Sequence, residues 1–256
     1  MTFDPFGDFA TRGYLRNLAN EKDAAIVRRL EHVSFTTGID EAFARLATKR
    51  PLSYADILST HKILFEAVYP WAGQDRATTS PDVAVSRGSV LFAHPKYIQN
   101  AIDHGLKLGN DPKTMREKPG EVMGYLAHGH PFLDGNGRTI MVIHAVLVQR
   151  AGFSIDWAAT DKNAYLDALT KELDDPGKGI LDAYLKPYVR PAVDNLSDHW
   201  PRPKASMAAR ARPIPSMAAT TIPRCRRNTS NSNSSGSTSA MIGDAGWQRL
   251  VTTGAA

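Results

Sequence analysis

Apolar residues recur at steps of three and four along most of the first ~190 residues, and this spacing constrains the fold more than any other feature of the sequence. It places apolar side chains on one face of an α-helix, whereas a half-buried strand alternates them. Ser53 is a suitable N-cap for one such segment, which Pro70 follows, and Gly38 predicts a break in another. Helices are expected over residues 22–48, 53–69, 97–108, 120–128, 136–151, 163–173 and 178–189.

Residues 78–92 carry a different pattern. Val83 and Val85 alternate, the run from Ser86 to Ser89 can turn, and Val90 resumes the apolar character. Alternation interrupted by a turn sequence is typical of a β-hairpin. The chain is therefore expected to fold as a mainly α domain of about seven or eight helices with one small β-hairpin.

The composition changes near Trp200. From there on the chain is rich in Pro, Ser, Ala and Asn without a sustained apolar period, so it cannot bury enough surface to offset the entropy of ordering. Lys and Arg number 31 and Asp and Glu 26, but eight basic residues and one acidic residue lie from Trp200 onward, which leaves 23 basic and 25 acidic residues before it. The basicity belongs to a solvated tail, and no nucleic-acid partner is expected.

The sequence also predicts a compartment. Its apolar runs are only a few residues long, far short of the ~20 needed to cross a bilayer. The N-terminus carries acidic residues and lacks the apolar stretch of a secretion signal. A single cysteine, Cys225, cannot form an internal disulfide. No membrane association is expected, and the cytoplasm is the default location.

The segment HPFLDGNGR, residues 130–138, lies between two expected helices and gathers side chains suited to phosphate chemistry. Gly135 and Gly137 let backbone N–H groups approach an anion where a helix N-terminus presents unpaired donors. Arg138 offers a forked donor set for phosphate, Asp134 a hard oxygen ligand for Mg²⁺, and His130 a base that titrates near neutral pH. A glycine turn or a lone histidine is usually only structural, but the joint pattern is specific.

This segment resembles the signature of the Fic family, His-x-Phe-x-Asp/Glu-Gly-Asn-Gly-Arg. The stretches GYLRN, HKILFEAVYPWAGQDR and GFSIDWAATDKNAYLDAL are also similar to the family, so the likeness extends over roughly residues 13–191. It implies a Fic-type helical bundle in which the hairpin is a flap. We therefore expect a Fic domain over residues 1–195 and a disordered, basic tail rich in Pro, Ser and Asn over residues 196–256.

The resemblance implies transfer of AMP from ATP to a Ser, Thr or Tyr hydroxyl of a target protein. His130 would be the general base for the attacking hydroxyl, and Asp134 would bind the Mg²⁺ that bridges the α- and β-phosphates. Because phosphoryl transfer depends on positioning and charge stabilisation, a short set of residues is sufficient. Phe132 is also expected to anchor the loop in the core. The implied nucleotide-binding residues are Phe132, Gly135, Asn136, Gly137 and Arg138, with Gly135 to Arg138 as the phosphate cradle.

The hairpin corresponds to the family's flap, whose edge would dock a target segment as an added strand. A plain surface hairpin is the alternative. Arg76 could belong to the site or form a surface ion pair, and Tyr165 could lie near the base pocket or pack in the core. The expected docking residues are Val85, Ser86, Arg87 and Gly88.

The chain departs from the family in two places. Met141 stands where the family has a second arginine, three positions after Arg138. The inhibitory motif Ser/Thr-x-x-x-Glu-Gly/Asn is incomplete, because the nearest candidate runs from Thr37 to Glu41 and is followed by Ala42. Intrinsic autoinhibition is therefore not expected, and a separate antitoxin-like partner could supply the missing glutamate.

Three functions stay open on the sequence. Mg²⁺-dependent AMP transfer is favoured, and the same scaffold could instead transfer UMP, phosphate or phosphocholine. Met141 suggests a third function, a degenerate module that binds nucleotide or protein without turnover. Intact His130 and Asp134 argue against degeneracy, since binding alone needs neither. The expected biological class is a bacterial toxin or effector, located in the cytoplasm or delivered to that of a host cell.

Overall fold

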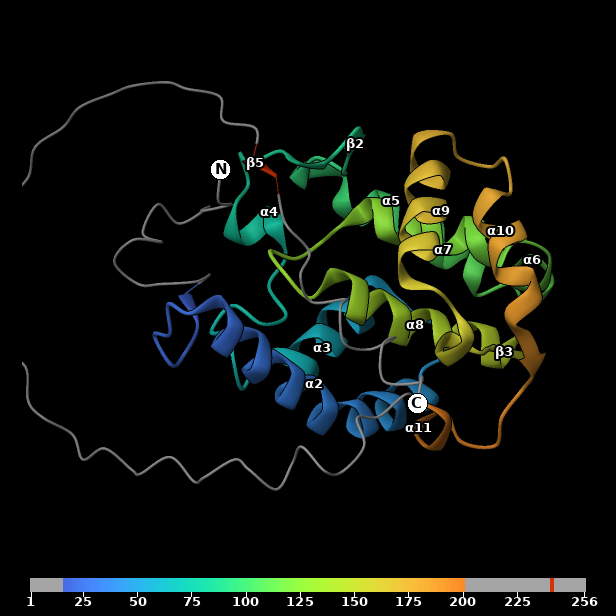
Figure 1. Cartoon of the computed structure of the whole chain (residues 1–256), viewed down its shortest axis with the longest axis horizontal. Coiled ribbons are helices and arrows are strands. Elements are labelled where there is room, and N and C mark those ends of the chain that lie inside the picture. The colour runs from blue at the N-terminus through green and yellow to red at the C-terminus, as the bar shows by residue number, and fades with distance from the viewer. Residues whose placement is uncertain (1–15, 201–239, 242–256) are drawn as a thin grey trace, which may run out of the picture.

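The computed structural model describes residues 16–200 together with Ala240 and Met241 (Figure 1). Residues 1–15, 201–239 and 242–256 lie outside the described residues, and so does most of the expected tail. The helices are α2 (Ala24–Ala47), α3 (Tyr54–Phe65), α4 (Arg76–Thr79), α5 (Ile98–Gly109), α6 (Pro112–Glu117), α7 (Pro119–Gly129), α8 (Asn136–Arg150), α9 (Lys162–Asp174), α10 (Ile180–Leu185) and α11 (Leu196–His199). The 3-10 helices are η2 (Pro95–Tyr97), η3 (Trp157–Ala159) and η4 (Lys186–Tyr188), and the strands are β1 (Val85–Arg87), β2 (Val90–Leu91), β3 (Phe153–Ile155), β4 (Val189–Pro191) and β5 (Ala240–Met241).

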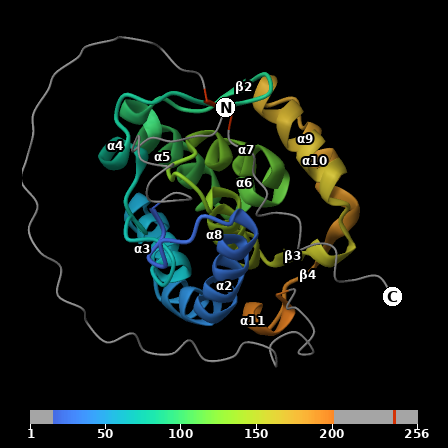
Figure 2. The same cartoon turned by 60° about the vertical axis from the view of Figure 1, so that its left-hand side comes forward.

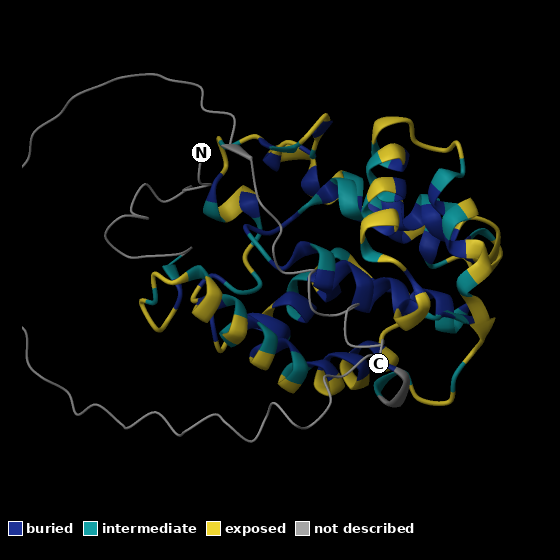
Figure 3. Ribbon diagram, in the orientation of Figure 1, coloured by how far each residue is buried: buried dark blue, intermediate teal, exposed yellow. Residues whose placement is uncertain are grey.

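Helix α8 lies at the centre of the molecule (Figures 1 and 2). It contacts α2 and α3, and it also contacts α7 and β3. Nearly every residue from Asn136 to Val148 is buried, as expected for a core helix that is covered all round. In Figure 3 the buried residues gather around α8, while the outer face of α2 is exposed. The motif that precedes α8 is thus attached to the most enclosed element of the fold. Among the described helices, none combines the length and the apolar character needed to span a membrane.

Helix α2 runs through Gly38 without interruption, so the expected break at this residue is wrong. A Cβ at position 38 would lie 2.6 Å from the carbonyl oxygen of Ile63 in α3. The glycine therefore permits close approach of two packed helices instead of ending one. The helix begins after Asp23, whose carboxylate accepts from the N–H of Ala25 at 2.7 Å.

Helix α3 begins where the sequence predicts but ends four residues earlier. Ser53 and Asp56 form a capping box, in which the Ser53 N–H donates to the Asp56 carboxylate at 2.8 Å. The expected end was Tyr69, but the N–H groups of Val68 and Tyr69 both donate to the carbonyl of Phe65. This shared acceptor turns the chain out of the helix.

The expected helix over residues 178–189 is also shorter. Helix α10 covers Ile180–Leu185 and passes into η4 and β4. Pro187 lies at this transition and lacks the backbone N–H that a continuing helix needs. Strand β4 then pairs antiparallel with β3, a small sheet that the sequence pattern did not indicate.

The hairpin is confirmed. Strands β1 and β2 pair antiparallel, with Ser86 opposite Leu91 and Arg87 opposite Val90. The turn between them contains Gly88 with φ 58°, a conformation that favours glycine. On its other edge β1 pairs in parallel with β5, which completes a three-stranded sheet in the order β2-β1-β5.

The folded chain continues past residue 195, where the domain was expected to end. Helix α11 follows directly, and Trp200 after it is buried. The Trp200 ring lies 5.5 Å from the ring of Phe43 and 6.3 Å from that of Phe35, both on α2. Trp200 is therefore part of the hydrophobic core.

Candidate active site

The segment HPFLDGNGR forms the loop between α7 and α8. Helix α7 ends at Gly129, and His130 follows with the left-handed φ of 41°. Gly135 is also left-handed, with φ 76°, and α8 begins directly after it without a side-chain cap. The first N–H groups of a helix have no intrahelical partner and carry partial positive charge. The loop thus places a helix N-terminus suited to anions close to His130.

Gly135 has no room for a side chain. A Cβ there would lie 2.6 Å from Cε2 of Phe65 and 3.1 Å from Nε2 of His61. Its positive φ adds a second penalty for any other residue. Backbone conformation and packing therefore both require glycine at this position.

Two reciprocal hydrogen bonds between Phe132 and Asn136 close the loop. The Phe132 N–H donates to Oδ1 of Asn136 at 2.7 Å, and Nδ2 of Asn136 donates to the Phe132 carbonyl at 2.7 Å. The ring of Phe132 is fully buried and anchors the loop in the core. Because both side chains are used within the protein, these residues can offer a ligand mainly their backbone groups.

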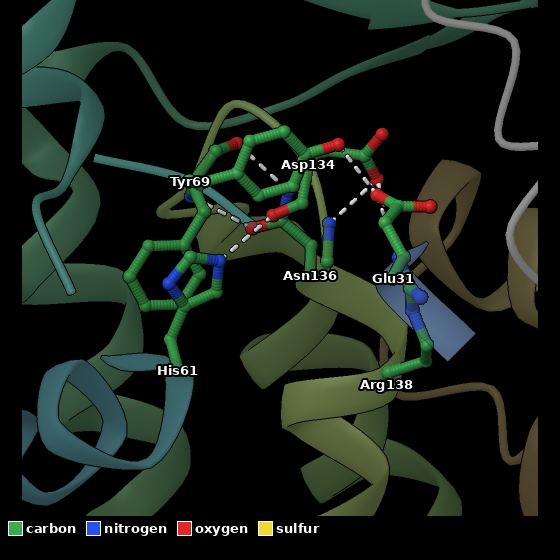
Figure 4. Close-up of polar contacts among 8 residues, drawn as sticks. Glu31, His61, Tyr69, Asp134, Asn136 and Arg138 are labelled. Atoms are coloured by element: carbon green, nitrogen blue, oxygen red, sulfur yellow. Dashed lines mark hydrogen bonds and ion pairs between the residues drawn. The ribbon is translucent and has the colours of Figure 1, made fainter. Parts of the chain in front are cut away.

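His61 of α3 supports the loop from the protein interior (Figure 4). Its Nδ1 accepts from the Gly73 N–H at 2.9 Å, so the ring proton is on Nε2, which donates to the Asp134 carbonyl at 3.0 Å. The imidazole stacks on Phe132 with ring centroids 3.7 Å apart. Burial lowers the pKa of His61 to about 3. The neutral ring therefore fixes the backbone of Asp134.

Arg76 is buried and donates to three backbone carbonyls. Its Nε donates to His130 at 2.8 Å, its Nη2 to Ala93 at 2.8 Å and its Nη1 to Val83 at 3.3 Å. Val83 and Ala93 lie just before and just after the β1–β2 hairpin. Arg76 thus fastens the flap to the start of the loop, and the surface ion pair considered for it does not form. Burial lowers the pKa of Arg76 to about 10, so it stays charged at neutral pH.

The imidazole of His130 stacks on Phe92 of the flap, with ring centroids 4.0 Å apart. Its Nε2 is buried without a hydrogen-bond partner among the described residues. Burial lowers the pKa of His130 well below its ordinary value, and the charges of Arg76 and Arg87 act in the same direction. A neutral imidazole with an unpaired nitrogen can accept a proton.

His130 opens on a cleft between the flap, α7, the N-terminus of α8 and α9. The lining is mostly apolar, and Arg87 is the one permanently charged residue of the described lining. An apolar cleft with a few converging polar groups is typical of a small-molecule site. It is lined by Arg87, Val90, Phe92, Met123, Ala127, His130, Asn136, Gly137, Ile140, Tyr165, Leu166, Leu169, Thr170 and Leu173.

Arg138 lies on the other side of the loop and is buried (Figure 4). Its Nη2 is 3.2 Å from Oε1 of Glu31 on α2, and its guanidinium lies 4.5 Å from the ring centroid of Phe65. Glu31 also accepts from the hydroxyl of Tyr69 at 2.7 Å. Burial, and secondarily the charge of Asp134, raises the pKa of Glu31. A buried carboxylate therefore balances the arginine that was expected to hold the leaving phosphates.

Asp134 is the candidate metal ligand. One carboxylate oxygen accepts from the Gly135 N–H at 2.6 Å and lies 3.8 Å from Nη2 of Arg138. The described residues contain no group of three His, Cys, Asp or Glu side chains that could hold a metal alone. Mg²⁺ is commonly held by one or two carboxylates together with substrate phosphates and water. The donor set therefore fits Mg²⁺ as an ion shared with a nucleotide.

Met141 is buried in α8 with 2% of its surface exposed. It packs in the core and offers the cleft neither a charge nor a hydrogen-bond donor. Glu41, at the end of the candidate inhibitory motif, is exposed on α2. On the same helix it is Glu31 that reaches an arginine of the motif.

The four expected docking residues face different ways. Val85 is buried, Ser86 and Arg87 are half-buried, and Gly88 is exposed in the turn. Of the four, only Arg87 lines the cleft. Tyr165 fulfils both alternatives considered for it, since it is buried in the core and also lines the cleft.

Sequence reasoning missed Glu31 and His61. Each is a polar residue inside a buried helical stripe: Glu31 lies four residues after Val27, and His61 four residues after Ile57. A buried polar group needs a partner, so such a residue predicts a specific contact. That signal could have identified both.

Residues 51–148 match the Fic/DOC family. The chain is 28% identical over 167 residues to the probable protein adenylyltransferase y4lH of Sinorhizobium fredii, which covers 61% of this chain and 82% of that protein. It is 30% identical over 168 residues to the protein adenylyltransferase VbhT of Bartonella schoenbuchensis, which covers 62% of this chain and 34% of VbhT. The chain thus matches only about a third of the length of VbhT.

Solved structures share the fold. The N-terminal Fic domain of a VirB-translocated Bep effector protein from Bartonella quintana, with bound ADP, has a TM-score of 0.57 and 22% identity, covering 72% of this chain and 94% of that one. The effector protein BepC from Bartonella tribocorum, with bound AMPPNP, has a TM-score of 0.55 and 19% identity, covering 68% and 91%. The mainly helical Fic-type fold predicted from the sequence is therefore confirmed.

Proposed function

Because this chain belongs to the Fic/DOC family, we propose that it is a protein adenylyltransferase, which moves AMP from ATP to a hydroxyl side chain of a target protein. The relatives y4lH and VbhT bear that name, and two proteins of the same fold were solved with AMPPNP or ADP. The observation that carries the proposal is His130, which is neutral, has an unpaired Nε2 and lies next to the N-terminus of α8.

The nucleotide is expected to place its phosphates at the N-terminus of α8 and its adenosine in the apolar cleft. Backbone N–H groups of Asn136 and Gly137 would donate hydrogen bonds to phosphate oxygens, because the first turn of a helix leaves its donors without intrahelical partners. Leu169 and Tyr165 of α9 offer apolar surface for the base. The left-handed Gly135 lets the chain approach the anion closely.

Mg²⁺ is the expected cofactor, and Asp134 its protein ligand. Two contacts hold this residue in place: its carboxylate accepts from the Gly135 N–H, and its carbonyl accepts from His61. When bound, Mg²⁺ would neutralise phosphate charge and favour departure of the leaving group. Arg138, whose charge is balanced by Glu31, lies beside the Asp134 carboxylate.

The proposed transfer step moves one proton, forms one bond and breaks another. Nε2 of His130 takes the proton of the attacking Ser, Thr or Tyr hydroxyl. The hydroxyl oxygen forms a bond to the α-phosphorus, and the bond from that phosphorus to the oxygen bridging the β-phosphate breaks. Pyrophosphate leaves with the bonding electron pair. The helix N-terminus stabilises the charge on the α-phosphate without moving, which is how a preorganised site lowers the barrier.

A target segment is expected to dock at the edge of β1, next to Ser86. β5 pairs with this edge in parallel, so a target segment would have to take the place of β5 there. Phe92, whose N–H donates to the carbonyl of Val85 next to Ser86, stacks on His130, so a segment added to the flap would lie close to the base. A separate inhibitor remains compatible with this site, but it would need a contact other than an ion pair with residue 141, because Met141 is buried and uncharged.

Radiolabelled ATP tests the proposal. The full chain is incubated with Mg²⁺, a bacterial or host lysate and ATP labelled at either the α- or the γ-phosphate. Protein labelling from the α position alone is expected. Labelling from the γ position would indicate a kinase, and labelling only from UTP or a phosphocholine donor would indicate a different transferred group. Nucleotide binding without labelling from any donor would contradict an enzymatic function. His130→Ala should abolish the labelling, and His104→Ala, which removes an exposed histidine, is its matched control.

A further inference from the structure

The cleft around His130 is short of cations for a triphosphate. Arg138 is buried and paired with Glu31, and it does not line the cleft in the described part of the chain. Met141 is buried and uncharged. A site for a polyanion needs positive charge beyond one helix N-terminus. The side chain that supplies it must come from another element.

The flap contributes an arginine to this cleft. Side chains alternate between the two faces of a strand, so Val85 and Arg87 of β1 point to one face and Ser86 to the other. Val85 is fully buried, which identifies their face as the inner one. Arg87 accordingly lines the cleft together with His130 and Gly137.

The guanidinium of Arg87 has no hydrogen-bond or ion-pair partner among the described residues, although it is half-buried. Arg76, the neighbouring buried arginine, differs because three backbone carbonyls occupy it. The charge of Arg87 is nevertheless close enough to help lower the pKa of His130. An arginine with unused donors beside an anion site is suited to bind phosphate oxygens.

The hairpin that carries Arg87 is fixed to the loop. Arg76 binds the carbonyls of Val83 and Ala93 at the two ends of the hairpin and the carbonyl of His130 at the start of the loop. The same hairpin rests on His130 through Phe92. These contacts hold Arg87 in the cleft that the first residues of α8, Asn136 and Gly137, also line, so that one phosphate chain could contact both.

We infer that Arg87 is a nucleotide-binding residue, which contacts the phosphates of the nucleoside triphosphate in the same cleft as the N-terminus of α8. This assignment rests on the proposed function and replaces the target-docking role expected for Arg87. Arg87 on the inner face of the flap would then bind the donor nucleotide, whereas Ser86 points to the outer face.

Calorimetric binding of AMPPNP, AMP and adenosine to the full chain tests the inference, with Mg²⁺ present and ionic strength held constant. Arg87→Met should weaken AMPPNP binding about ten- to a hundred-fold, the strength of a charge-assisted hydrogen bond. Adenosine binding should change less than about two-fold, since it lacks the phosphates that the guanidinium recognises. Arg87→Lys should recover part of the loss, because it keeps the charge and loses the fork. Lys96→Met removes an exposed charge from η2 next to the flap and is the matched control.

Each outcome has a distinct meaning. Unchanged AMPPNP affinity in Arg87→Met, with a raised KM for the target protein, would overturn the assignment and return Arg87 to target docking. Equal weakening of AMPPNP and adenosine would also overturn it, because that pattern indicates a displaced flap. A wild-type chain that binds no adenine nucleotide would refute the proposed function itself, and the assignment of Arg87 with it.

Discussion

Replacing His61 with leucine should reveal how strongly the fold depends on one neutral histidine beneath the loop. In the folded protein, Nδ1 accepts from the Gly73 N–H and Nε2 donates to the Asp134 carbonyl. His61→Leu leaves both backbone groups without these partners. Each unsatisfied group costs about 1–3 kcal/mol, so the variant should lose about 2–6 kcal/mol of unfolding free energy at pH 7.

The loss of unfolding free energy in His61→Leu, relative to wild type, should be smaller at acid pH. Burial lowers the pKa of His61 to about 3, against an ordinary value of 6.5. Between these values the unfolded chain binds a proton that the folded protein does not, so this contribution to stability is complete above pH 6.5 and is lost as pH falls toward 3. At pH 4.5 wild type should have lost about 2.7 kcal/mol through His61, a loss that His61→Leu cannot show.

Urea unfolding of both proteins at pH 7 and pH 4.5 provides the measurement. The stability difference between them should narrow by about 2.7 kcal/mol at the lower pH. Buried His130 and His144 are present in both proteins, so their contributions to the pH dependence of stability cancel in the comparison. His104→Leu removes one histidine from the unfolded chain and no buried one from the folded protein, so it controls for the unfolded state. If the difference in unfolding free energy between wild type and His61→Leu is the same at both pH values, His61 is not a neutral ring held by two hydrogen bonds in the folded protein.

Three further perturbations test the site and the domain boundary. Gly135→Ala should abolish transfer and destabilise the protein by about 2–4 kcal/mol, because the new Cβ would overlap the ring of Phe65 in α3. The left-handed φ of this residue adds a backbone penalty for alanine. A variant with normal melting temperature and activity would contradict this prediction. Arg76→Met should lower both the melting temperature and the transfer rate, because three backbone carbonyls lose their donor. Arg116→Met, which leaves one carbonyl without its donor, should lower the melting temperature only. A similar loss of activity in both variants would show that Arg76 does not position the loop and the flap. A chain that ends after Trp200 should have the melting temperature of wild type. A chain that ends after Asn195 should lose about 3–5 kcal/mol of unfolding free energy, because it lacks the buried indole of Trp200. Equal melting temperatures of the two truncated chains would place the domain boundary at residue 195.

The sequence predicted those helices and strands that are determined by residues a few positions apart in the chain. The spacing of apolar residues identified α5, α7, α8 and α9 within one or two residues, and Ser53 identified the start of α3. Both depend on neighbours a few positions away in the chain. The hairpin followed from a turn sequence for the same reason.

Contacts between distant segments were the part that could not be predicted. Gly38 reads as a helix breaker until α3 is known to pass within 2.6 Å of its missing Cβ. Trp200 reads as the first residue of a tail until Phe35 and Phe43 are seen to enclose it. In each case the partner is decided by packing, which a one-dimensional pattern does not encode.

In the candidate active site too, the sequence predicted what adjacent residues determine and missed what distant residues determine. The motif residues His130 and Asp134 were identified because they are adjacent in sequence. The direction in which Arg138 points was not, since it is set by Glu31, which lies more than 100 residues earlier in the chain. Arg87 was assigned to the target because strand alternation alone does not say which face of a hairpin is the inner one.

The role of His130 is the centre of this account, and comparing His130→Ala with wild type in both nucleotide binding and transfer tests it most directly. A general base acts on the attacking hydroxyl and need not contact bound ATP, so the AMPPNP dissociation constant should stay within about three-fold of wild type. The rate of α-phosphate label transfer should fall at least about a hundred-fold. Retained transfer, or a loss of binding as large as the loss of transfer, would contradict the assignment of His130 as the base.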